Sequence, residues 1–344
     1  MRYSIIVPVY NRPDEVKELL ESLTRQAFSD YEVIIVEDGS TVTCKDVCDS
    51  FADILPLTYY YKANSGPGQS RNYGAERAKG DWLIILDSDI VLPDDYLTSV
   101  GAELATRLMD GEVSAFGGPD AAHPSFTPVQ KAISYSMTSF FTTGGIRGGK
   151  AGKTATQRVK GKAMDKFYPR SYNMGIRREV YQQLGGFSKM RFGEDIDFSY
   201  RIVEAGYKTC LFPTAWVWHK RRTDLKKFFR QVYNSGIARI NLEKRHPGTM
   251  KPVHLLPMLF TLGVLLLLLL SPWCLWTLTP LLAYALIICI HSSVVNKSLR
   301  VGLLSVPAAF TQLMGYGLGF INAWWKRCVL RQDEFQAFEK TFYK

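Results

Sequence analysis

Two aspartates separated by one residue, Asp87 and Asp89, follow directly after the apolar run Trp-Leu-Ile-Ile-Leu at 82–86. A carboxylate pair at the end of a strand can point into one cleft and hold a hard divalent cation, Mg²⁺ or Mn²⁺, through oxygen ligands. A cation held in this way keeps positions open for two phosphate oxygens and neutralises a departing nucleoside diphosphate. Such pairs are also common in solvated turns, so the position behind a buried strand is what makes this pair a candidate.

Two further polar motifs precede this pair in the chain. Residues 36–40, Val-Glu-Asp-Gly-Ser, follow a second apolar run. There Asp38 can accept hydrogen bonds from a nucleobase or ribose, or it can simply begin an Asp-Gly turn. Residues 64–72, Asn-Ser-Gly-Pro-Gly-Gln-Ser-Arg-Asn, form a glycine-rich loop that leads into a helix. The N-terminus of that helix, together with Arg71, can receive phosphate or base oxygens.

The elements that must position these side chains alternate between short strands and helices. Apolar runs predict strands at 3–9, 32–36, 57–61 and 82–86, and helical patterns lie at 14–26 and 68–79. Such alternation predicts a doubly wound, mostly parallel α/β sheet, in which ligands gather at the carboxyl ends of the strands. The acidic clusters at 37–38 and 87–89 fall at two of those ends.

These motifs, in this order, resemble family 2 glycosyltransferases. The resemblance is carried by residues 7–12 (Val-Pro-Val-Tyr-Asn-Arg), 36–40, 64–72 with Gly74, 87–89, 173–175, 185–187, 193–195, Asp197 and Arg201. It covers roughly residues 1–240, with several ordered motifs at plausible spacing, and is therefore specific at the level of the family.

The resemblance implies the A-type glycosyltransferase fold, one compact α/β domain that binds a nucleotide sugar and a divalent cation and inverts the anomeric centre. It puts Asp38 at the nucleotide, and Asp87 and Asp89 at the diphosphate and the metal. The full set of residues that it implies at the donor is Pro8, Tyr10, Arg12, Glu37, Asp38, Asn64, Gly66, Arg71, Asp87 and Ser88.

The catalytic base and a third metal ligand are also implied by the resemblance. Asp195 falls where the family keeps its general base, and Glu194 is the second choice. Inversion by a single displacement requires a carboxylate that takes the proton of the acceptor hydroxyl during attack. Acids at this place would also cap the start of a helix, and the two roles are compatible. His219 resembles the later histidine that family members bring to the metal or diphosphate, although its aromatic and basic neighbours are equally typical of a structural or interfacial position.

One departure from the family concerns processivity. Processive polysaccharide synthases of the family carry a Gln-x-x-Arg-Trp motif near this region. Here Gln231 is followed by Val-Tyr-Asn-Ser, so the Arg-Trp pair is missing. The sequence therefore favours the addition of one sugar per encounter.

The distribution of charge points to a membrane. The chain has 344 residues and a formal net charge of +10, and residues 220–251 contain ten Lys or Arg but only two acids. Directly after this belt, residues 252–296 contain no Asp, Glu, Lys or Arg. One membrane span needs about 20 apolar residues, so this block suits a hairpin of two helices. A basic belt beside an apolar block indicates an anionic membrane surface and a cytoplasmic catalytic domain, and disfavours a nucleic-acid binder.

The sequence allows two interpretations for the membrane topology of residues 301–325 and for the role of the basic stretch 142–170. Residues 301–325 are uncharged, but a third full crossing would place Lys326, Arg327 and Arg331 outside, against the positive-inside rule, so an in-plane or re-entrant segment is the alternative. The glycine-rich stretch 142–170 contains eight Lys or Arg and one acid, and reads as a loop that binds an anionic acceptor or donor phosphates, or as a solvated basic loop.

We therefore expect a catalytic domain over 1–240, with a nucleotide-binding half at 1–110 and an acceptor-binding half at 111–240. A membrane-associated region follows at 241–344, with a helical hairpin at about 253–295. The leading hypothesis is an inverting, metal-dependent, non-processive hexosyl transfer from a nucleotide sugar, with UDP favoured, to a lipid-linked or saccharide acceptor in cell-surface polysaccharide or glycolipid synthesis at the inner membrane. Alternatives are direct transfer to polyprenyl phosphate and, in another class, a non-catalytic membrane scaffold that retains the fold.

Overall fold

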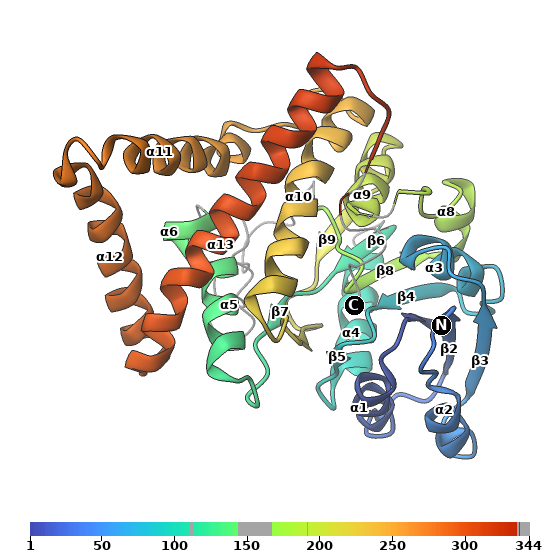
Figure 1. Ribbon diagram of the computed structural model, residues 1–344. Coiled ribbons are helices and arrows are strands. Elements are labelled where there is room, and N and C mark those ends of the chain that lie inside the picture. Colours follow the sequence, from blue (N-terminus) through green and yellow to red (C-terminus); the bar gives the residue numbers. More distant parts are fainter. Residues whose placement is uncertain (110–112, 144–166, 191, 336, 338–344) are drawn as a thin grey trace. The chain divides into compact units, whose positions relative to one another are not determined.

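The computed structural model describes residues 1–109, 113–143, 167–190, 192–335 and 337. The chain forms two compact units (Figure 1). The first contains residues 1–123 and 149–220, and the second contains residues 124–148 and 221–344. The predicted end of the catalytic domain near residue 240 stays a prediction. By its contacts, the segment from residue 221 onward belongs to the second unit. Most of the predicted basic loop, residues 144–166, lies outside the described residues.

The first unit is built around a seven-stranded sheet with the order β3-β2-β1-β4-β8-β6-β9. Its strands are β1 (Tyr3–Val9), β2 (Tyr31–Asp38), β3 (Leu57–Lys62), β4 (Trp82–Leu86), β8 (Asn173–Arg177), β6 (Ala115–Gly117) and β9 (Thr209–Leu211). The first four pair in parallel, whereas β8 runs antiparallel to both of its neighbours. The sequence prediction of a mostly parallel α/β sheet is confirmed.

Helices cover the two faces of this sheet. They are α1 (Pro13–Leu23), α2 (Lys45–Phe51), α3 (Pro67–Ala75), α4 (Tyr96–Met109), α8 (Arg178–Gln183) and α9 (Glu194–Glu204). Residues of β1 alternate between two hydrophobic clusters, with Ile5 and Val7 in one and Ile6 in the other, because successive strand side chains point to opposite faces. Both α1 and α3 begin at a proline, which fits the first turn of a helix because its nitrogen needs no partner there.

A small second sheet, ordered β5-β10-β7, completes the first unit. It consists of β5 (Ile90–Val91), β10 (Val217–His219) and β7 (Asp120–Ala121). In its register His219 lies opposite Ile90, and Val217 lies opposite Asp120. This sheet therefore joins the segment after β4 to a strand that is more than a hundred residues away in the sequence.

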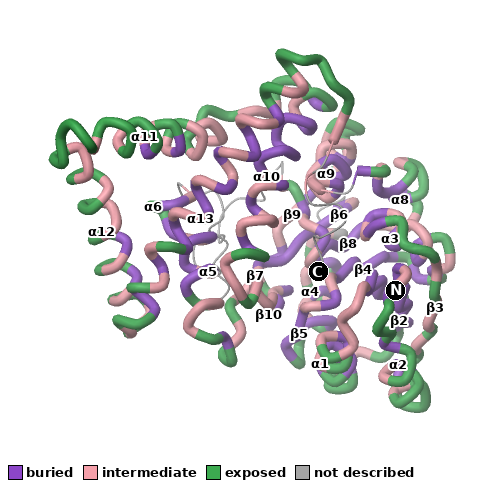
Figure 2. The backbone as a smooth tube through the Cα atoms, viewed as in Figure 1, coloured by how far each residue is buried: buried purple, intermediate pink, exposed green. Residues whose placement is uncertain are grey.

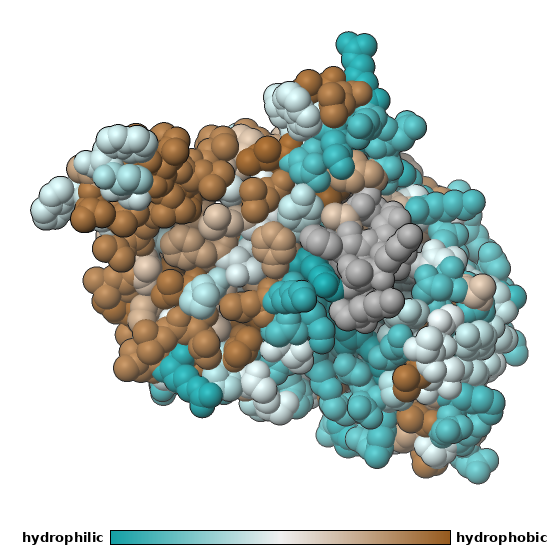
Figure 3. All heavy atoms as spheres, viewed as in Figure 1, coloured by the Kyte–Doolittle hydropathy of each residue, from teal (hydrophilic) through white to brown (hydrophobic). Residues whose placement is uncertain are grey.

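The second unit is helical. It contains α5 (Pro128–Thr138), α6 (Phe140–Thr143), α10 (Leu225–Arg245), η1 (Pro252–Leu255), α11 (Leu256–Leu270), η2 (Leu275–Leu278), α12 (Thr279–Asn296), α13 (Leu299–Trp324) and η3 (Trp325–Val329). Among the described residues, three helical stretches are long and apolar enough to cross a membrane: Pro252–Leu270, Leu275–Asn296 and Leu299–Val329. Leucine and tryptophan side chains of α11 and the turn after it are widely exposed, and Figures 2 and 3 show exposed, hydrophobic surface over α11 and α12.

Candidate active site

The two aspartates after β4 lie beside a histidine from β10. Carboxylate oxygens of Asp87 and Asp89 and a ring nitrogen of His219 all lie within 4.8 Å of one another. Asp89 Oδ1 is 3.4 Å from His219 Nε2, and Asp89 Oδ2 is 3.5 Å from a guanidinium nitrogen of Arg12. The pairing of β10 with β5 brings the histidine here, since His219 is the register partner of the residue that follows Asp89. Ser88, between the aspartates, is buried.

A carboxylate from β7 faces the other side of the histidine ring. Asp120 Oδ2 is 3.7 Å from His219 Nδ1. The ring also stacks on Tyr172, with 5.1 Å between the centroids. A carboxylate at Nδ1 favours the tautomer that turns an unprotonated Nε2 toward a metal. Sequence reasoning missed Asp120, because only the register of the small sheet places it next to the histidine.

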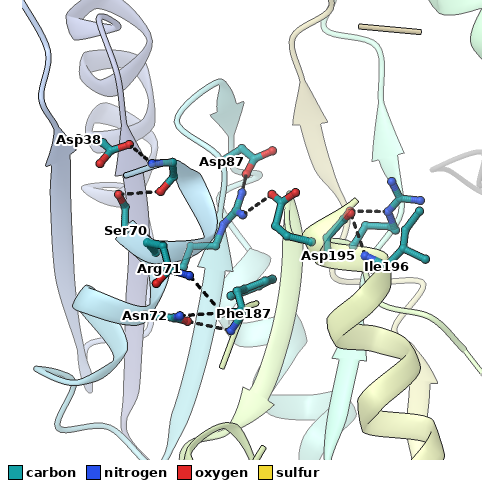
Figure 4. A network of polar contacts seen from close by, with 12 residues as sticks. Asp38, Ser70, Arg71, Asn72, Asp87, Phe187, Asp195 and Ile196 are labelled. Atoms are coloured by element: carbon teal, nitrogen blue, oxygen red, sulfur yellow. Dashed lines mark hydrogen bonds and ion pairs between the residues drawn. The ribbon is translucent and has the colours of Figure 1, made fainter. Parts of the chain in front are cut away.

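Arg71 links the Asp87 motif to the acids at the start of α9. Its side chain is 4% exposed, and its guanidinium donates to Asp87 Oδ1 at 2.8 Å and to Glu194 Oε1 at 2.9 Å (Figure 4). The guanidinium carbon also lies 5.2 Å from the centre of the Phe187 ring. The sequence analysis assigned Arg71 to donor oxygens; in the structure it neutralises two carboxylates from separate motifs.

The helix start that carries Glu194 and Asp195 is shaped by a glycine. Gly193 is the N-cap of α9 with φ of +85°, a left-handed conformation that glycine adopts without a Cβ clash. The predicted acid-rich first turn is confirmed, with Glu194, Asp195 and Asp197 in it. Acidic side chains stabilise a helix N-terminus because they complement its positive end.

The two neighbouring acids have opposite electrostatic environments. Burial raises the pKa of Glu194 to about 7, although the Arg71 guanidinium opposes the shift. Burial acts on Asp195 in the same sense, but Arg170, whose Nε is 2.6 Å from Asp195 Oδ2, together with Arg71 and the backbone N–H of Ile196, holds the pKa of Asp195 below its usual value. Near neutral pH, Asp195 is therefore ionised, whereas Glu194 is close to its midpoint.

The loop after β1 is tied to the loop after β2. The Asn11 amide oxygen accepts hydrogen bonds from the backbone N–H of Thr41 at 2.8 Å and Val42 at 3.0 Å. The Asn11 backbone N–H donates to Ser40 Oγ at 2.8 Å. Asn11 adopts a φ of +53°, which asparagine tolerates better than most residues. These bonds fix the backbone around the predicted donor residues Tyr10 and Arg12, whose side chains are partly exposed, while Pro8 is buried in β1.

The acids at the end of β2 hold local structure. The Asp38 carboxylate forms an ion pair with Lys62 and accepts from the backbone N–H groups of Ser65 and Gly66, each at 2.9 Å. The Asn64 side chain donates to the Asp38 carbonyl at 2.7 Å.

Glu37, which precedes Asp38 at the end of β2, is completely buried. The Glu37 carboxylate accepts from the Ser40 hydroxyl and from the Cys44 backbone N–H at 2.7 Å. These contacts fix the turn after β2 and the start of α2.

The structure thus brings the residues predicted for the site into two groups. Asp87, Asp89, His219, Arg71 and Glu194 form one connected set, with Asp195 next along the helix. The second group is the loop after β2 with the Gly-rich segment, in which Asp38 binds the backbone ahead of α3. Both groups lie where parallel strands end, as the doubly wound fold requires.

A family model described as glycosyl transferase family 2 matches residues 4–185, more than half of the chain. The chain belongs to this family. The match contains both aspartates after β4 and Arg71, so the resemblance drawn from the motifs is confirmed.

Relatives of this glycosyltransferase match only part of their own length. The pre-mycofactocin glycosyltransferase of Mycobacterium tuberculosis is 26% identical over 267 residues, which are 73% of this chain and 49% of that one. An uncharacterised glycosyltransferase of Haemophilus influenzae is 49% identical over 87 residues, which are 25% of this chain and 29% of that one. The chain therefore spans less than half of either curated relative.

Among solved structures, the mannosyltransferase PcManGT from Pyrobaculum calidifontis, determined in complex with GDP-Man and Mn²⁺, shares the fold. The TM-score is 0.60 at 19% identity, and the match covers 91% of this chain and 87% of that chain. At this identity the likeness establishes the fold alone, and it confirms the expected A-type glycosyltransferase architecture.

Proposed function

We propose that this chain transfers a hexosyl group from a nucleoside-diphosphate sugar, UDP-linked in the first instance, to an acceptor hydroxyl, with inversion of the anomeric centre. The observation that carries the proposal is the connected set Asp87, Asp89, His219, Arg71 and Glu194 at the carboxyl ends of the strands. Its parts correspond to the two requirements of the reaction, stabilisation of a departing diphosphate and removal of a proton from the acceptor.

The donor set fits a divalent cation held by Asp87, Asp89 and His219. Two carboxylates supply hard oxygen ligands, and the imidazole adds a nitrogen ligand that Mn²⁺ accepts more readily than Mg²⁺ does. PcManGT, whose structure contains Mn²⁺ with GDP-Man, supports the same class of ion. When bound, such an ion would offset the charge that develops on the leaving diphosphate.

The residues of this chain would then divide the remaining work. Arg71 orients Asp87 before the donor arrives, because its guanidinium donates a hydrogen bond of 2.8 Å to that carboxylate. The loops after β1 and β2, joined through Asn11, would hold the nucleotide, with Asp38 and Arg12 nearest to it. A site built on strand ends and locked loops is preorganised, so little ordering remains to be done in the transition state.

Asp195 is the proposed general base. It is ionised at neutral pH, because Arg170 lowers its pKa, and it lies in the first turn of α9 directly beside Glu194, the acid that Arg71 joins to Asp87. As base, Asp195 would accept the proton of the acceptor hydroxyl while the anomeric carbon is attacked and the bond to the diphosphate breaks. Glu194 is the second candidate, because its pKa of about 7 suits proton transfer near neutral pH.

We further propose a lipid-linked or saccharide acceptor, one sugar added per encounter, and a role in cell-surface polysaccharide or glycolipid synthesis at the cytoplasmic face of the inner membrane. The three apolar helical stretches support membrane association. Direct transfer to polyprenyl phosphate is the alternative within this class, and acceptor profiling separates the two. A non-catalytic scaffold, the alternative of another class, would not require the intact set of acids.

The test is donor hydrolysis and transfer by the detergent-solubilised full chain, with a panel of nucleotide sugars and with Mn²⁺, Mg²⁺ or a chelator. We expect one donor to be consumed only with metal, and kcat to fall by about a hundredfold or more in Asp89→Asn and in Asp195→Asn. Asp94→Asn is the matched control, since the Asp94 side chain is 69% exposed and forms an ion pair with Arg25 away from the site. Turnover of no donor, even with membrane lipids present, would favour the scaffold.

A further inference from the structure

The longest of the three apolar helices, α13, lies along the charged helix α10. The α13 backbone approaches that of α10 at two glycines, Gly319 of α13 and Gly236 of α10: a Cβ added to Gly319 would lie 2.0 Å from the carbonyl oxygen of Tyr233, and one added to Gly236 would lie 2.2 Å from that of Tyr316. At Gly315 the added Cβ would lie 2.6 Å from Val232. At Gly319 and Gly236 the two backbones touch without an intervening side chain, so the two helices lie at the same depth relative to any membrane.

The two helices also run in the same direction. Val232 faces Gly315, Tyr233 faces Gly319, and Ile240 belongs to one hydrophobic cluster with Phe320 and Ala323, so residue numbers rise together along both helices. Figure 1 shows α10 and α13 side by side with their C-terminal ends close together. Because the two helices are parallel and in contact, α13 cannot enter the membrane without α10 entering it as well.

The composition of α10 excludes it from the hydrocarbon core. Its 21 residues include six Lys or Arg and one Glu: Lys226, Lys227, Arg230, Arg239, Glu243, Lys244 and Arg245. A charged side chain at the centre of a bilayer costs about 2.5–3.5 kcal/mol even on the most permissive scale. Accordingly, α10 is not among the helices apolar enough to span a membrane.

The segment after α13 returns to α10 through polar contacts. Arg245 forms an ion pair with Glu334 at 2.8 Å. The Asn234 side chain donates to the carbonyl of Ala337 at 3.1 Å and accepts from its N–H at 3.0 Å. The Asn241 side chain donates to the Phe335 carbonyl at 3.4 Å. The C-terminal side of α13 is therefore held to the helix that follows the catalytic unit in the chain.

The course of the chain also indicates on which side of the membrane α13 begins and ends. If α11 and α12 each cross the membrane, α13 begins on the side where α10 ends. A crossing α13 would then run away from that side, whereas α10, parallel to it and in contact with it, ends there. Because the C-terminal end of α13 lies beside the C-terminal end of α10, α13 ends on the same side of the membrane on which it begins.

We propose that α13 does not cross the membrane: both of its ends lie on the side of the catalytic unit, and its outer face lies on the lipid surface of that side. The exposed apolar residues of α13 and of the turn that follows it are Leu299, Leu303, Trp324, Trp325, Val329 and Leu330. Paired tryptophans followed by Lys326 and Arg327 are typical of the boundary between lipid and water. In this topology α11 and α12 are the helices that cross the membrane. This topology rests on the proposed membrane association and is independent of the sugar-transfer chemistry.

The test is the reaction of single cysteines at the two ends of α13 with a membrane-impermeant maleimide, in intact cells and in inverted membrane vesicles of a bacterial host. All reporters are made in a chain that carries Cys210→Ser and Cys289→Ser, in which Cys44 and Cys48 remain but are buried. Native Cys328, which is exposed, reports the C-terminal end when Cys274→Ser is added. Val295→Cys, at a position 57% exposed, reports the N-terminal end when Cys274→Ser and Cys328→Ser are added. Native Cys274, in the turn between α11 and α12, reports the far end of the apolar block when Cys328→Ser is added.

We expect both ends of α13 to react in inverted vesicles and to be protected in intact cells, with a tag on the catalytic unit defining the inner side. Reaction of the two ends from opposite sides would overturn the proposal. So would failure of either end to react before detergent is added, since both ends adjoin lysines that belong in water. Release of the chain from membranes by carbonate would overturn the membrane association itself, whatever the donor assay shows. Reaction of Cys274 from outside supports a crossing by α11 and α12, and its reaction from inside would overturn their role as the spanning pair.

Discussion

Replacement of Arg71 by methionine should destabilise the first unit strongly, and more so at alkaline pH. The guanidinium is almost fully buried and compensates Asp87 and Glu194 at 2.8 and 2.9 Å. Methionine keeps much of the side-chain volume and the contact with Phe187 but leaves the two carboxylates facing each other. Of the two, Glu194 matters more for stability, because its side chain is 9% exposed whereas that of Asp87 is 30% exposed.

The magnitude follows from the cost of an uncompensated buried charge, about 3–5 kcal/mol when one partner of a buried pair is removed. For a domain of this size that cost lowers the melting temperature by about 6–20 °C. The pH dependence has a definite sign. Burial raises the pKa of Glu194 to about 7, above its unfolded value, so its contribution to stability is full at acid pH and is lost as the pH rises through 7. Loss of Arg71 raises that pKa further, so the penalty of the variant should grow above pH 7 by at most about 1.4 kcal/mol per pH unit.

The assay is thermal unfolding of the full chain in detergent between pH 6 and pH 9, in a double-mutant cycle with Glu194→Gln. The second substitution removes the buried charge, so Arg71→Met with Glu194→Gln should recover much of the loss and should lose the pH dependence. Arg77→Met is the control, since Arg77 is partly exposed and lies over the Tyr73 ring. A loss below about 1 kcal/mol at pH 8.5, or no recovery in the double variant, would refute the idea that Arg71 compensates a buried Glu194.

Three further outcomes are expected. Asp120→Asn should weaken Mn²⁺ binding by about 10–100-fold without lowering the melting temperature, as measured by electron paramagnetic resonance, because the carboxylate orients His219; unchanged affinity would contradict that role. Gly319→Leu should prevent the close packing of α13 on α10 and reduce the yield of folded protein, whereas Gly263→Leu on α11, where an added Cβ meets nothing within 4 Å, should be tolerated. Asn72→Ala removes two hydrogen bonds to Phe187 in the turn ahead of α9 and one from the Tyr181 hydroxyl of α8, each worth about 1 kcal/mol, and should lower both stability and kcat; a variant with wild-type melting temperature would show that the turn is held by other contacts.

The elements of the first unit were predictable because their signals are local. Apolar runs such as Trp82–Leu86 are short, β-rich and followed by polar residues, and the structure has a strand there. Helix α9 was expected from acids at its start, and it begins at Glu194. Boundaries differ by a few residues where two principles compete. Thus α3 begins at Pro67, since proline suits a first turn, and ends at Ala75, four residues before the predicted end.

The candidate site was predictable as a list of residues but not as a set of contacts. The sequence predicts that Arg71 and Asp38 bind a ligand. In the structure Arg71 pairs with Asp87 and Glu194, and Asp38 pairs with Lys62 and with the loop before α3. Such pairings depend on which strand ends adjoin, and that is a property of the sheet order. Asp120 carried no local signal at all.

The family, the alternation of strands and helices and the apolar C-terminal region can all be inferred from the order of the residues, because motif spacing, hydrophobic period and runs without charge are properties of neighbouring residues. The tertiary structure alone decided which acids share Arg71, which carboxylate faces His219 and which helix lies against α13. Those contacts join residues as far apart as Arg71 and Glu194, or Gly236 and Phe320, and their distances are set by sheet register and by close backbone packing.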